Sequence, residues 1–337
     1  MNKGDLIMEK VRFGIISCAG IAKKRFIPAI AEASNAVLVA VASRNLEKAR
    51  QFASENQIPA ACGSYEALLS QEDIDAVYIP LPNGLHKAWA IKAMEQGKHV
   101  LCEKPLAPTQ KDCEELAAVA HSNGVILMEA FMYRFHPLTE FVIQQVQNGE
   151  LGDIHAIQAC FSFVLDDPDN VRFQPDLAGG SVMDVGCYGI NCTRTFFHEE
   201  PEAVSAIAHY SKPRVDDRMT IFAQFRSGKQ AQIICGFSSQ APEGYMISGS
   251  KGWIASWNGF RLGVEHGKII REIDGIRSSF EDATNEYTKM IEHFSDCVIH
   301  KTSPRYDAIE SGRNMAVICA AIESAEKNGE WVHLKSG

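Results

Sequence analysis

The chain has 337 residues, of which 46% are hydrophobic and 22% charged, values typical of a globular protein that can bury a large core. At roughly 150 residues per domain, this length predicts two domains. The formal net charge of −9 argues against a protein that mainly binds nucleic acid or a membrane surface, because both need a basic excess. No apolar run approaches the roughly 18 residues needed to span a bilayer, so we expect neither nucleic acid nor a membrane as a partner.

The N-terminal segment and the cysteines indicate a cytoplasmic protein. Residues 1–10 are polar and lack the hydrophobic stretch of a secretory signal. The ten cysteines include no C-x-x-C pair and lie mostly in apolar runs, where a free thiol behaves as a small hydrophobe. We therefore predict reduced, buried thiols and no metal site, since no metal-ligand spacing occurs.

Strand and helix patterns alternate over the first 130 residues. Short apolar runs predict strands at 11–16, 36–42, 75–80, 99–102 and 125–129. The segments between them have helical spacing and predict helices at 21–33, 45–55, 85–96 and 110–122. Buried strands that alternate with helices predict a parallel, doubly wound sheet of the Rossmann type. We assign residues 10–130 to this α/β domain.

The pattern changes after about residue 150. Longer strands are predicted at 155–164, 203–210, 219–225, 230–238 and 245–248, joined by short turns such as Ser227-Gly228. These hairpin signals favour an antiparallel sheet, interrupted by one helix at about 180–197. Residues 131–305 form this predicted second domain. A last helix at about 306–328 lies in a third segment, 306–337, which we expect to pack back on the first domain.

The turn after the first predicted strand is made of small residues. A strict G-x-G-x-x-G motif is absent, and Ser17, Ala19 and Ala22 occupy its three glycine positions. Small residues between a first strand and a first helix let the backbone approach a pyrophosphate at the helix N-terminus. The alternative is an ordinary strand-to-helix turn.

The end of the second predicted strand bears on the choice of cofactor. NAD-binding sites usually place an acidic residue there to hold the ribose hydroxyls, but this chain has Ser43-Arg44. The planar fork of an Arg can pair with a 2′-phosphate. We therefore predict NADP ahead of NAD, with a solvated surface Arg as the alternative.

The tripeptide Glu103-Lys104-Pro105 follows the predicted strand 99–102 directly. Ligands of open α/β sheets bind at the carboxyl ends of the strands. The Lys104 ammonium could there donate to a substrate hydroxyl or lower the pKa of a nearby acid. A surface lysine is the alternative reading.

A second dense segment runs from Gly179 to Asn191. Asp184 and Tyr188 are four residues apart and share one face of the predicted helix. A carboxylate and a phenol on one face can hold and deprotonate a hydroxyl, provided that a cation lowers the pKa of the phenol. The alternative is a packed helix with a capping Asp.

Two further segments could contact a cofactor. Residues 128–137 are rich in aromatics, with Arg134 and His136 among them, and either wall a nicotinamide pocket or belong to the core. His86 opens a predicted helix near the end of a strand.

Together these segments resemble the Gfo/Idh/MocA family of pyridine-nucleotide oxidoreductases. The resemblance rests on residues 14–22, 43–44, 81–86, 103–105, 128–137 and 179–191, which occur in the family's order. It implies an N-terminal Rossmann domain and a C-terminal α/β domain with a large, open, mostly antiparallel sheet. That sheet often forms an oligomer interface in the family, so we expect a homodimer or homotetramer.

Within the family, the motifs resemble one subgroup in particular. Tyr188 stands where many members have His, and Asn191 stands where many have Asp. This resembles the dimeric dihydrodiol dehydrogenases, the NADP-linked D-xylose dehydrogenases and glucose–fructose oxidoreductase, in which a Lys and a Tyr form the catalytic pair. The resemblance implies that Lys104, Tyr188 and Asp184 are catalytic. It implies cofactor contacts from Ser17, Cys18, Ala19, Gly20, Ile21, Ser43, Arg44, Pro80, Leu81, Asn83, His86, Glu103, Lys104 and Arg134.

The resulting hypothesis is an NADP-dependent dehydrogenase that acts on a sugar, a polyol or a related vicinal diol. Tyr188 is the predicted general acid/base, Lys104 is predicted to lower its pKa, and Asp184 is predicted to orient the substrate or Lys104. Two alternatives stay open: a dinucleotide-sensing regulatory protein without turnover, and a hydrolytic member that uses bound NAD as a transient oxidant.

Overall fold

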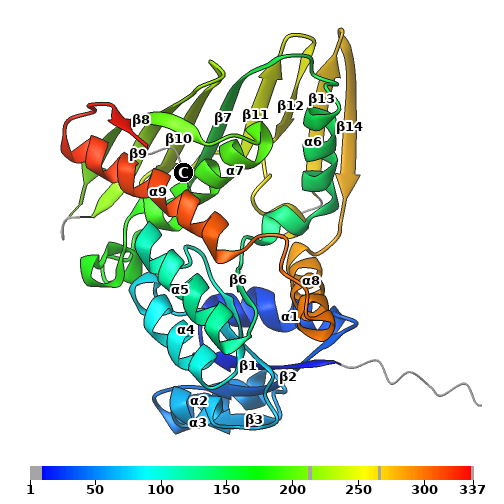
Figure 1. Cartoon of the computed structure of the whole chain (residues 1–337), viewed down its shortest axis with the longest axis vertical. Coiled ribbons are helices and arrows are strands. Elements are labelled where there is room, and N and C mark those ends of the chain that lie inside the picture. Colours follow the sequence, from blue (N-terminus) through cyan, green and yellow to red (C-terminus); the bar gives the residue numbers. More distant parts are fainter. Residues whose placement is uncertain (1–9, 212–214, 265–266, 335–337) are drawn as a thin grey trace, which may run out of the picture.

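A computed structural model describes residues 10–211, 215–264 and 267–334. The segment 1–9, on which the prediction of no signal sequence depends, lies outside the described residues. The chain forms two sheets, one in each half, with helices packed between and around them (Figure 1).

The first sheet has six parallel strands in the order β3-β2-β1-β4-β5-β6. This is the doubly wound order of a dinucleotide-binding fold, which confirms the predicted Rossmann sheet. Its strands are β1 (Val11–Ile16), β2 (Ala36–Ala42), β3 (Ala60–Cys62), β4 (Ala76–Ile79), β5 (His99–Cys102) and β6 (Leu127–Glu129). Its helices are α1 (Ile27–Glu32), α2 (Leu46–Glu55), α3 (Tyr65–Leu69), α4 (His86–Glu95) and α5 (Gln110–Asn123).

Local sequence explains where these helices begin and end. The Asn45 side chain accepts a hydrogen bond from the Lys48 amide at the start of α2, and Thr109 does the same for Asp112 at the start of α5. Gly124 ends α5 in the left-handed conformation (φ 63°) that glycine adopts without strain. The strands between them are apolar because helices cover both faces of the sheet.

The second sheet has nine strands in the order β14-β13-β12-β11-β7-β10-β9-β8-β15. All its pairs are antiparallel except β7 with β10, so the predicted mostly antiparallel sheet is confirmed. Its strands are β7 (Ile154–Ser162), β8 (Pro201–Tyr210), β9 (Asp216–Phe225), β10 (Gln230–Gly236), β11 (Gly244–Gly249), β12 (Gly252–Ser256), β13 (Gly267–Ile273), β14 (Ile276–Asp282) and β15 (Val332–His333).

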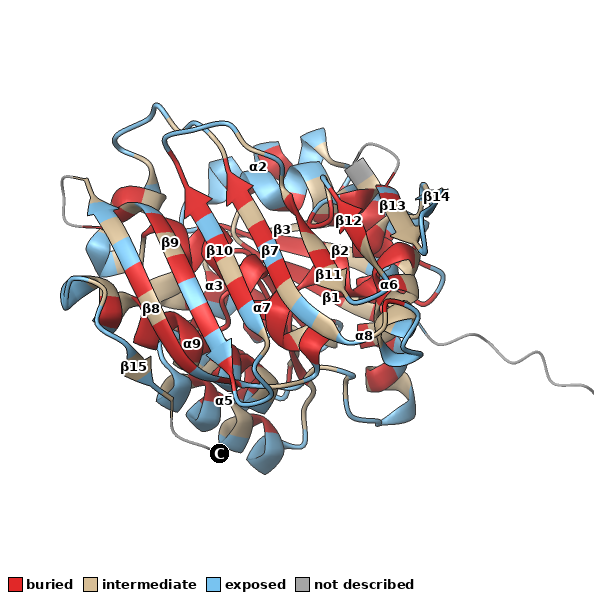
Figure 2. Cartoon of the chain, turned by 90° about the horizontal axis from the view of Figure 1, so that it is seen from above, coloured by how far each residue is buried: buried red, intermediate tan, exposed pale blue. Residues whose placement is uncertain are grey.

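Helices cover one face of this second sheet and leave the other open. The helices α6 (Pro137–Gln147), α7 (Cys187–Phe197) and α9 (Ala308–Glu326) contact its strands from the same side. Buried and exposed residues alternate along β9 and β10 (Figure 2), so the exposed side chains of these strands lie on the opposite face. This alternation is typical of a sheet with one face turned away from the core.

The structure corrects several predicted helices. The predicted helix 21–33 is a π-helical turn (Ala22–Phe26) followed by the short α1, and α9 begins at Ala308 because the Asp307 side chain caps it. The prediction of a single helix in the second half before the last one is wrong. Both α6 and α8 (Glu286–His300) were missed, as were strands β12 to β14.

The last two long helices return toward the first domain. Helix α8 packs on α1 and β1, and α9 packs on both α5 and β8. Their position along the boundary between the two sheets is visible in Figure 1. Across this boundary, the end of β5 contacts the turn ahead of α7 through Lys104 and Asp184.

Candidate active site

The turn after β1 has an open, strained backbone. Ser17 has a φ of +116°, a conformation that costs a non-glycine residue free energy and that occurs mainly at functional sites. A Cβ placed on Gly20 would meet no atom within 4 Å. The helical segment that follows starts without a side-chain cap, so its first N–H groups stay available to a ligand. Cys18 and Ala19 are partly buried in this turn, and Ile21 is exposed.

The end of β2 lies beside this turn. The Ser17 amide donates to the Ala42 carbonyl at 3.1 Å, and the Ser43 hydroxyl accepts from the Asn45 amide at 3.2 Å. Arg44 is exposed. Burial raises the pKa of Tyr65, and the neighbouring Arg44 charge opposes that shift. The structure therefore brings Ser43 and Arg44 to the same edge as the turn.

A buried chain of charges connects the two domains. The Lys104 ammonium donates to the Asp184 backbone carbonyl at 2.6 Å and to its carboxylate Oδ1 at 3.1 Å. The other carboxylate oxygen of Asp184 accepts from Arg172 Nε at 2.6 Å. The Lys104 and Asp184 side chains are each only 12% exposed. Lys104 comes from the end of β5 and Asp184 from a π-helical turn (Val182–Gly186) ahead of α7.

The pKa shifts of this pair follow from burial and charge. Burial alone would raise the pKa of Asp184, but Lys104 and Arg172 outweigh it and hold the pKa at about 2. Burial likewise opposes the charged form of Lys104, and the Asp184 charge outweighs it and raises the pKa of the ammonium. Both groups are therefore ionised at neutral pH.

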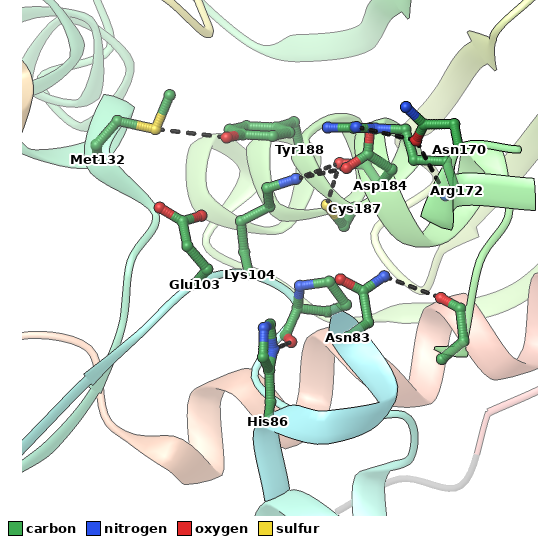
Figure 3. A network of polar contacts seen from close by, with 12 residues as sticks. Asn83, His86, Glu103, Lys104, Met132, Asn170, Arg172, Asp184, Cys187 and Tyr188 are labelled. Carbon is green, nitrogen blue, oxygen red and sulfur yellow. Dashed lines mark hydrogen bonds and ion pairs between the residues drawn. The ribbon is translucent and has the colours of Figure 1, made fainter. Parts of the chain in front are cut away.

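Tyr188 lies beside this pair in an aromatic cluster. The Lys104 ammonium is 5.1 Å from the centroid of the Tyr188 ring. The phenol oxygen is 3.4 Å from the sulfur of Met132 (Figure 3). The ring packs at 5.3–5.5 Å between centroids against Phe131, Phe161 and Phe260. The sequence thus correctly placed Tyr188 on the same helical segment as Asp184, one turn further on.

The predicted lowering of the Tyr188 pKa is not found. Burial raises the pKa of Tyr188 well above its ordinary value, and the neighbouring Tyr287 and Glu103 add to the shift. The Lys104 charge is directed at Asp184 instead (Figure 3). Tyr188 is consequently a neutral phenol at pH 7 whose hydroxyl carries its proton.

Glu103 and His86 form buried hydrogen bonds around the segment that carries Lys104. The Tyr78 hydroxyl donates to the Glu103 carboxylate at 2.6 Å, and burial raises the pKa of Glu103. The His86 ring is fully buried, with Nδ1 2.8 Å from the Pro105 carbonyl and Nε2 2.7 Å from the Leu81 carbonyl. Burial lowers the pKa of His86. His86 therefore links the ends of β4 and β5 from inside the fold.

The other predicted cofactor residues fall into two groups. Pro80 and Leu81 are buried at the end of β4, and the Asn83 amide donates to the Ala178 carbonyl of the second domain at 2.9 Å. Arg134 is buried in the turn that follows β6, where its guanidinium lies 3.2 Å from the centroid of the Tyr306 ring and pairs with Glu310 on α9. A cofactor contact from Arg134 stays a prediction.

Two residues that no sequence motif marks contribute to the site, Asp216 and Arg172. Asp216 on β9 accepts from the Ser181 hydroxyl at 2.6 Å and from the Val182 amide at 2.8 Å, and so holds the start of the segment that carries Asp184 and Tyr188. No local motif marks it, because the partners are more than 30 positions apart. Arg172 lies in the loop ahead of this segment, where a charge could hold a substrate hydroxyl or simply be solvated; in the structure its Nε donates to Asp184.

Neither a metal-binding cluster nor a membrane-spanning helix occurs in the described ranges. There, no group of three or more His, Cys, Asp or Glu residues is arranged to hold a metal ion. None of the helices in the same ranges is long and apolar enough to cross a membrane.

Fold and site together define a two-domain α/β protein with a dinucleotide-binding sheet. Residues 11–131 match the family model "Oxidoreductase family, NAD-binding Rossmann fold", and residues 140–255 match the "GFO/IDH/MocA C-terminal domain". The chain therefore belongs to the Gfo/Idh/MocA oxidoreductase family, which confirms the resemblance predicted from its motifs.

The chain matches named relatives over most of its length. D-xylose 1-dehydrogenase (NADP(+)) 2 of Haloferax volcanii is 40% identical over 93% of this chain and 97% of its own. Trans-1,2-dihydrobenzene-1,2-diol dehydrogenase of Xenopus tropicalis is 35% identical over 72% of this chain and 74% of its own. The crystal structure of KijD10, a 3-ketoreductase from Actinomadura kijaniata in complex with NADP and TDP-benzene, has a TM-score of 0.88 at 30% identity, covering 94% and 98%.

Proposed function

We propose that this protein is an NADP-dependent oxidoreductase that interconverts an alcohol and a carbonyl group of a sugar, a polyol or a vicinal diol. The observation that carries the proposal is the Lys104–Asp184 pair at the carboxyl end of β5, with Tyr188 packed beside the ammonium. The names of the relatives, which include an NADP-dependent sugar dehydrogenase and a diol dehydrogenase, support it.

The residues around the first turn fit a dinucleotide phosphate. The uncapped start of the first helical segment and the open space at Gly20 leave room for a pyrophosphate. Exposed Arg44 suits a 2′-phosphate, because a guanidinium binds phosphate oxygens with two parallel hydrogen bonds. When bound, the nicotinamide supplies or accepts the hydride.

Lys104 and Tyr188 would hold the reacting oxygen of the substrate. An ammonium has three N–H donors. Within the described residues, Lys104 donates two hydrogen bonds, both to Asp184. The third N–H can donate to the substrate oxygen. Because burial keeps Tyr188 protonated, its hydroxyl can give a proton to that oxygen as a carbonyl is reduced. In the reverse direction the phenol would first lose its proton to solvent, and the phenolate would then accept the proton of the substrate's hydroxyl group.

Asp184 is assigned a positioning role. Its carboxylate lies between two cations, which fixes the Lys104 side chain in one direction. A lysine without that partner would be free to rotate, and a precisely held donor contributes more to catalysis than a mobile one.

The open face of the second sheet is proposed as the contact between copies of this chain. Large apolar side chains are exposed on it, including Phe222 (44%), Ile234 (41%) and Trp257 (54%). A hollow in this face is lined by residues of β7, β10 and β11 together with Trp257. Clustered exposed apolar side chains on a soluble protein mark interaction surfaces, so we propose a homodimer or a homotetramer.

Replacement of Tyr188 by Phe tests the catalytic proposal. We expect Tyr188→Phe to lower kcat by about 10²–10⁴-fold, the usual contribution of a positioned proton donor, while NADPH binding is unchanged. The measurement is nicotinamide absorbance with D-xylose and with trans-1,2-diols as substrates, combined with a fluorescence titration of NADPH.

Tyr245→Phe is the matched control. Tyr245 is buried in the same aromatic cluster, 6.0 Å from Phe260 between ring centroids, and its hydroxyl has no hydrogen-bond partner among the described residues. This variant should keep the rate of the unmodified protein. A near-normal rate for Tyr188→Phe would remove Tyr188 from the proposed mechanism.

A further inference from the structure

Arg172 uses only part of its guanidinium to hold Asp184. Its Nε donates to the Asp184 carboxylate at 2.6 Å, whereas its Nη1 lies 3.5 Å from the Asn170 side-chain oxygen, at the limit of a hydrogen bond. A guanidinium carries five N–H donors. The Arg172 side chain is 38% exposed, against 12% for Asp184 and Lys104. Most of its donors are therefore still available to a ligand.

The backbone of Arg172 is held in place by two glycines. The Gly180 amide donates to the Arg172 carbonyl at 2.8 Å. A Cβ on Gly179 would lie 2.5 Å from the same carbonyl oxygen, so only glycine permits this close approach. The Asn170 side chain also accepts from the Arg172 amide at 3.2 Å. The segment that presents the guanidinium is thus fixed before any substrate arrives.

The same segment is attached to the first domain. Besides the hydrogen bond from Asn83 to the Ala178 carbonyl, Gly84 packs closely on the backbone of Asp176 and Leu177, where a Cβ would be 3.1 Å away. These contacts place Arg172 at a defined position relative to Lys104. Precise placement of this kind is what a binding group needs to discriminate between substrates.

Arg172 and Lys104 are separated by one carboxylate. Both cations bind Asp184, one at each oxygen. In Figure 3 the guanidinium lies beside the Tyr188 ring, on the side opposite to Met132. Because the two cations are held by the two oxygens of one carboxylate, their remaining donors can serve two oxygen atoms carried by neighbouring carbon atoms of a substrate.

We propose that Arg172 determines specificity by donating to the oxygen on the carbon next to the reacting one, while Lys104 and Tyr188 hold the reacting oxygen. This inference rests on the proposed function and narrows its substrate class to vicinal diols and α-hydroxy carbonyl compounds, including sugars that react at a carbon beside a hydroxyl group. A purely structural Arg172 would hold Asp184 and make no distinction between substrates.

The test compares substrates that differ by one hydroxyl. kcat/KM is measured with NADP⁺ for trans-cyclohexane-1,2-diol against cyclohexanol, and for D-xylose against 2-deoxy-D-xylose. The unmodified protein should prefer the substrate with the neighbouring hydroxyl. Arg172→Met should lower kcat/KM for that substrate by about 10- to 100-fold, as expected for a lost hydrogen bond to a charged group, and should lower it far less for the deoxy partner.

Two further variants keep the test decisive. Arg172→Lys retains a cation beside Asp184 but lacks the planar fork, so it should stay folded and still lose the preference. Val171→Ala alters a neighbouring side chain that is 45% exposed and should leave the preference intact. An equal loss on both substrates in the Arg172 variants overturns the inference and leaves a structural role. Absence of turnover by the unmodified protein on all four substrates overturns the proposed function, and this inference with it.

Discussion

At the scale of single residues, the site depends on which buried charges have partners. Asp184 has two cationic partners and stays ionised down to a pH of about 2. Glu129, at the end of β6, has none of comparable strength: its Oε1 accepts from the Leu106 amide at 2.7 Å, and its Oε2 has no hydrogen-bond partner among the described residues. Burial raises the pKa of Glu129 from 4.5 to about 7. Two buried carboxylates of the same protein therefore titrate very differently.

Glu129 makes stability depend on pH in a predictable direction. Its pKa is higher in the folded than in the unfolded protein, so the folded state holds the proton more tightly. The free energy of unfolding should therefore fall as pH rises from about 4.5 to about 7, by up to about 1.4 kcal/mol per pH unit from this group.

The variant Glu129→Gln isolates that contribution. The amide keeps an oxygen that can accept from the Leu106 amide, but it does not titrate. Urea unfolding at pH 5 and pH 7.5 should show a smaller difference between the two pH values for Glu129→Gln than for the unmodified protein. Equal differences in the two proteins would show that Glu129 does not titrate in this range.

Arg44 tests the cofactor assignment at the same scale. Arg44→Ala should weaken NADPH binding by roughly 10- to 100-fold, the usual effect of a lost hydrogen bond to a charged group. NADH binding should be unchanged, because NADH has no 2′-phosphate. Fluorescence titration of both nucleotides measures this. NADPH binding that survives the substitution would make Arg44 a surface charge only.

At the scale of elements, the segment that carries Asp184 and Tyr188 is fixed at its start. Asp216 binds the Ser181 hydroxyl and the Val182 amide. Gly180, directly before them, has a φ of +115°, and a Cβ there would lie 2.2 Å from the Asp216 carboxylate. This close approach explains why the segment begins with glycines rather than with an ordinary capping residue.

Gly180→Ala should therefore reduce both stability and kcat. Backbone strain alone costs roughly 1–3 kcal/mol, and the contact with Asp216 adds to it and displaces the catalytic segment. Gly124→Ala is the control: Gly124 also has a positive φ, but a Cβ there meets nothing within 4 Å, so stability falls and kcat does not. Equal kcat values for the two variants would show that the turn at Gly180 does not position the segment that carries Asp184 and Tyr188.

At the scale of the whole molecule, the two halves meet where the catalytic charges lie. Lys104 comes from the first sheet and Asp184 from the helical segment on the second. The predicted division into 10–130, 131–305 and 306–337 stays a prediction. Helix α8 packs on α1 and β1 of the first sheet, whereas α9 packs on both α5 of the first half and β8 of the second. The last two helices therefore return along the chain to connect the two halves.

The open sheet face makes a prediction about assembly. Ile234→Lys should shift the protein from an oligomer toward a monomer, because a charge would be buried at the proposed contact. Ile276→Lys places the same charge at a more exposed isoleucine, at the tip of the β13–β14 hairpin. This variant should keep the oligomeric state of the unmodified protein. Sedimentation velocity measures the mass, and a monomeric unmodified protein would refute the proposed interface.

The amino-acid sequence by itself determined the Rossmann sheet, the mostly antiparallel second sheet, the family and the pairing of Asp184 with Tyr188 on one segment. These features are local or periodic: apolar runs, capping residues and a four-residue spacing repeat within short windows. Only the tertiary structure decided which charge Lys104 faces, in which direction the pKa of Tyr188 shifts, and that Arg134 pairs with Glu310 of α9. It also decided that Asp216 binds the start of the catalytic segment and that Arg172 pairs with Asp184. These depend on burial and on contacts between segments far apart in the chain, and no spacing in the sequence encodes them.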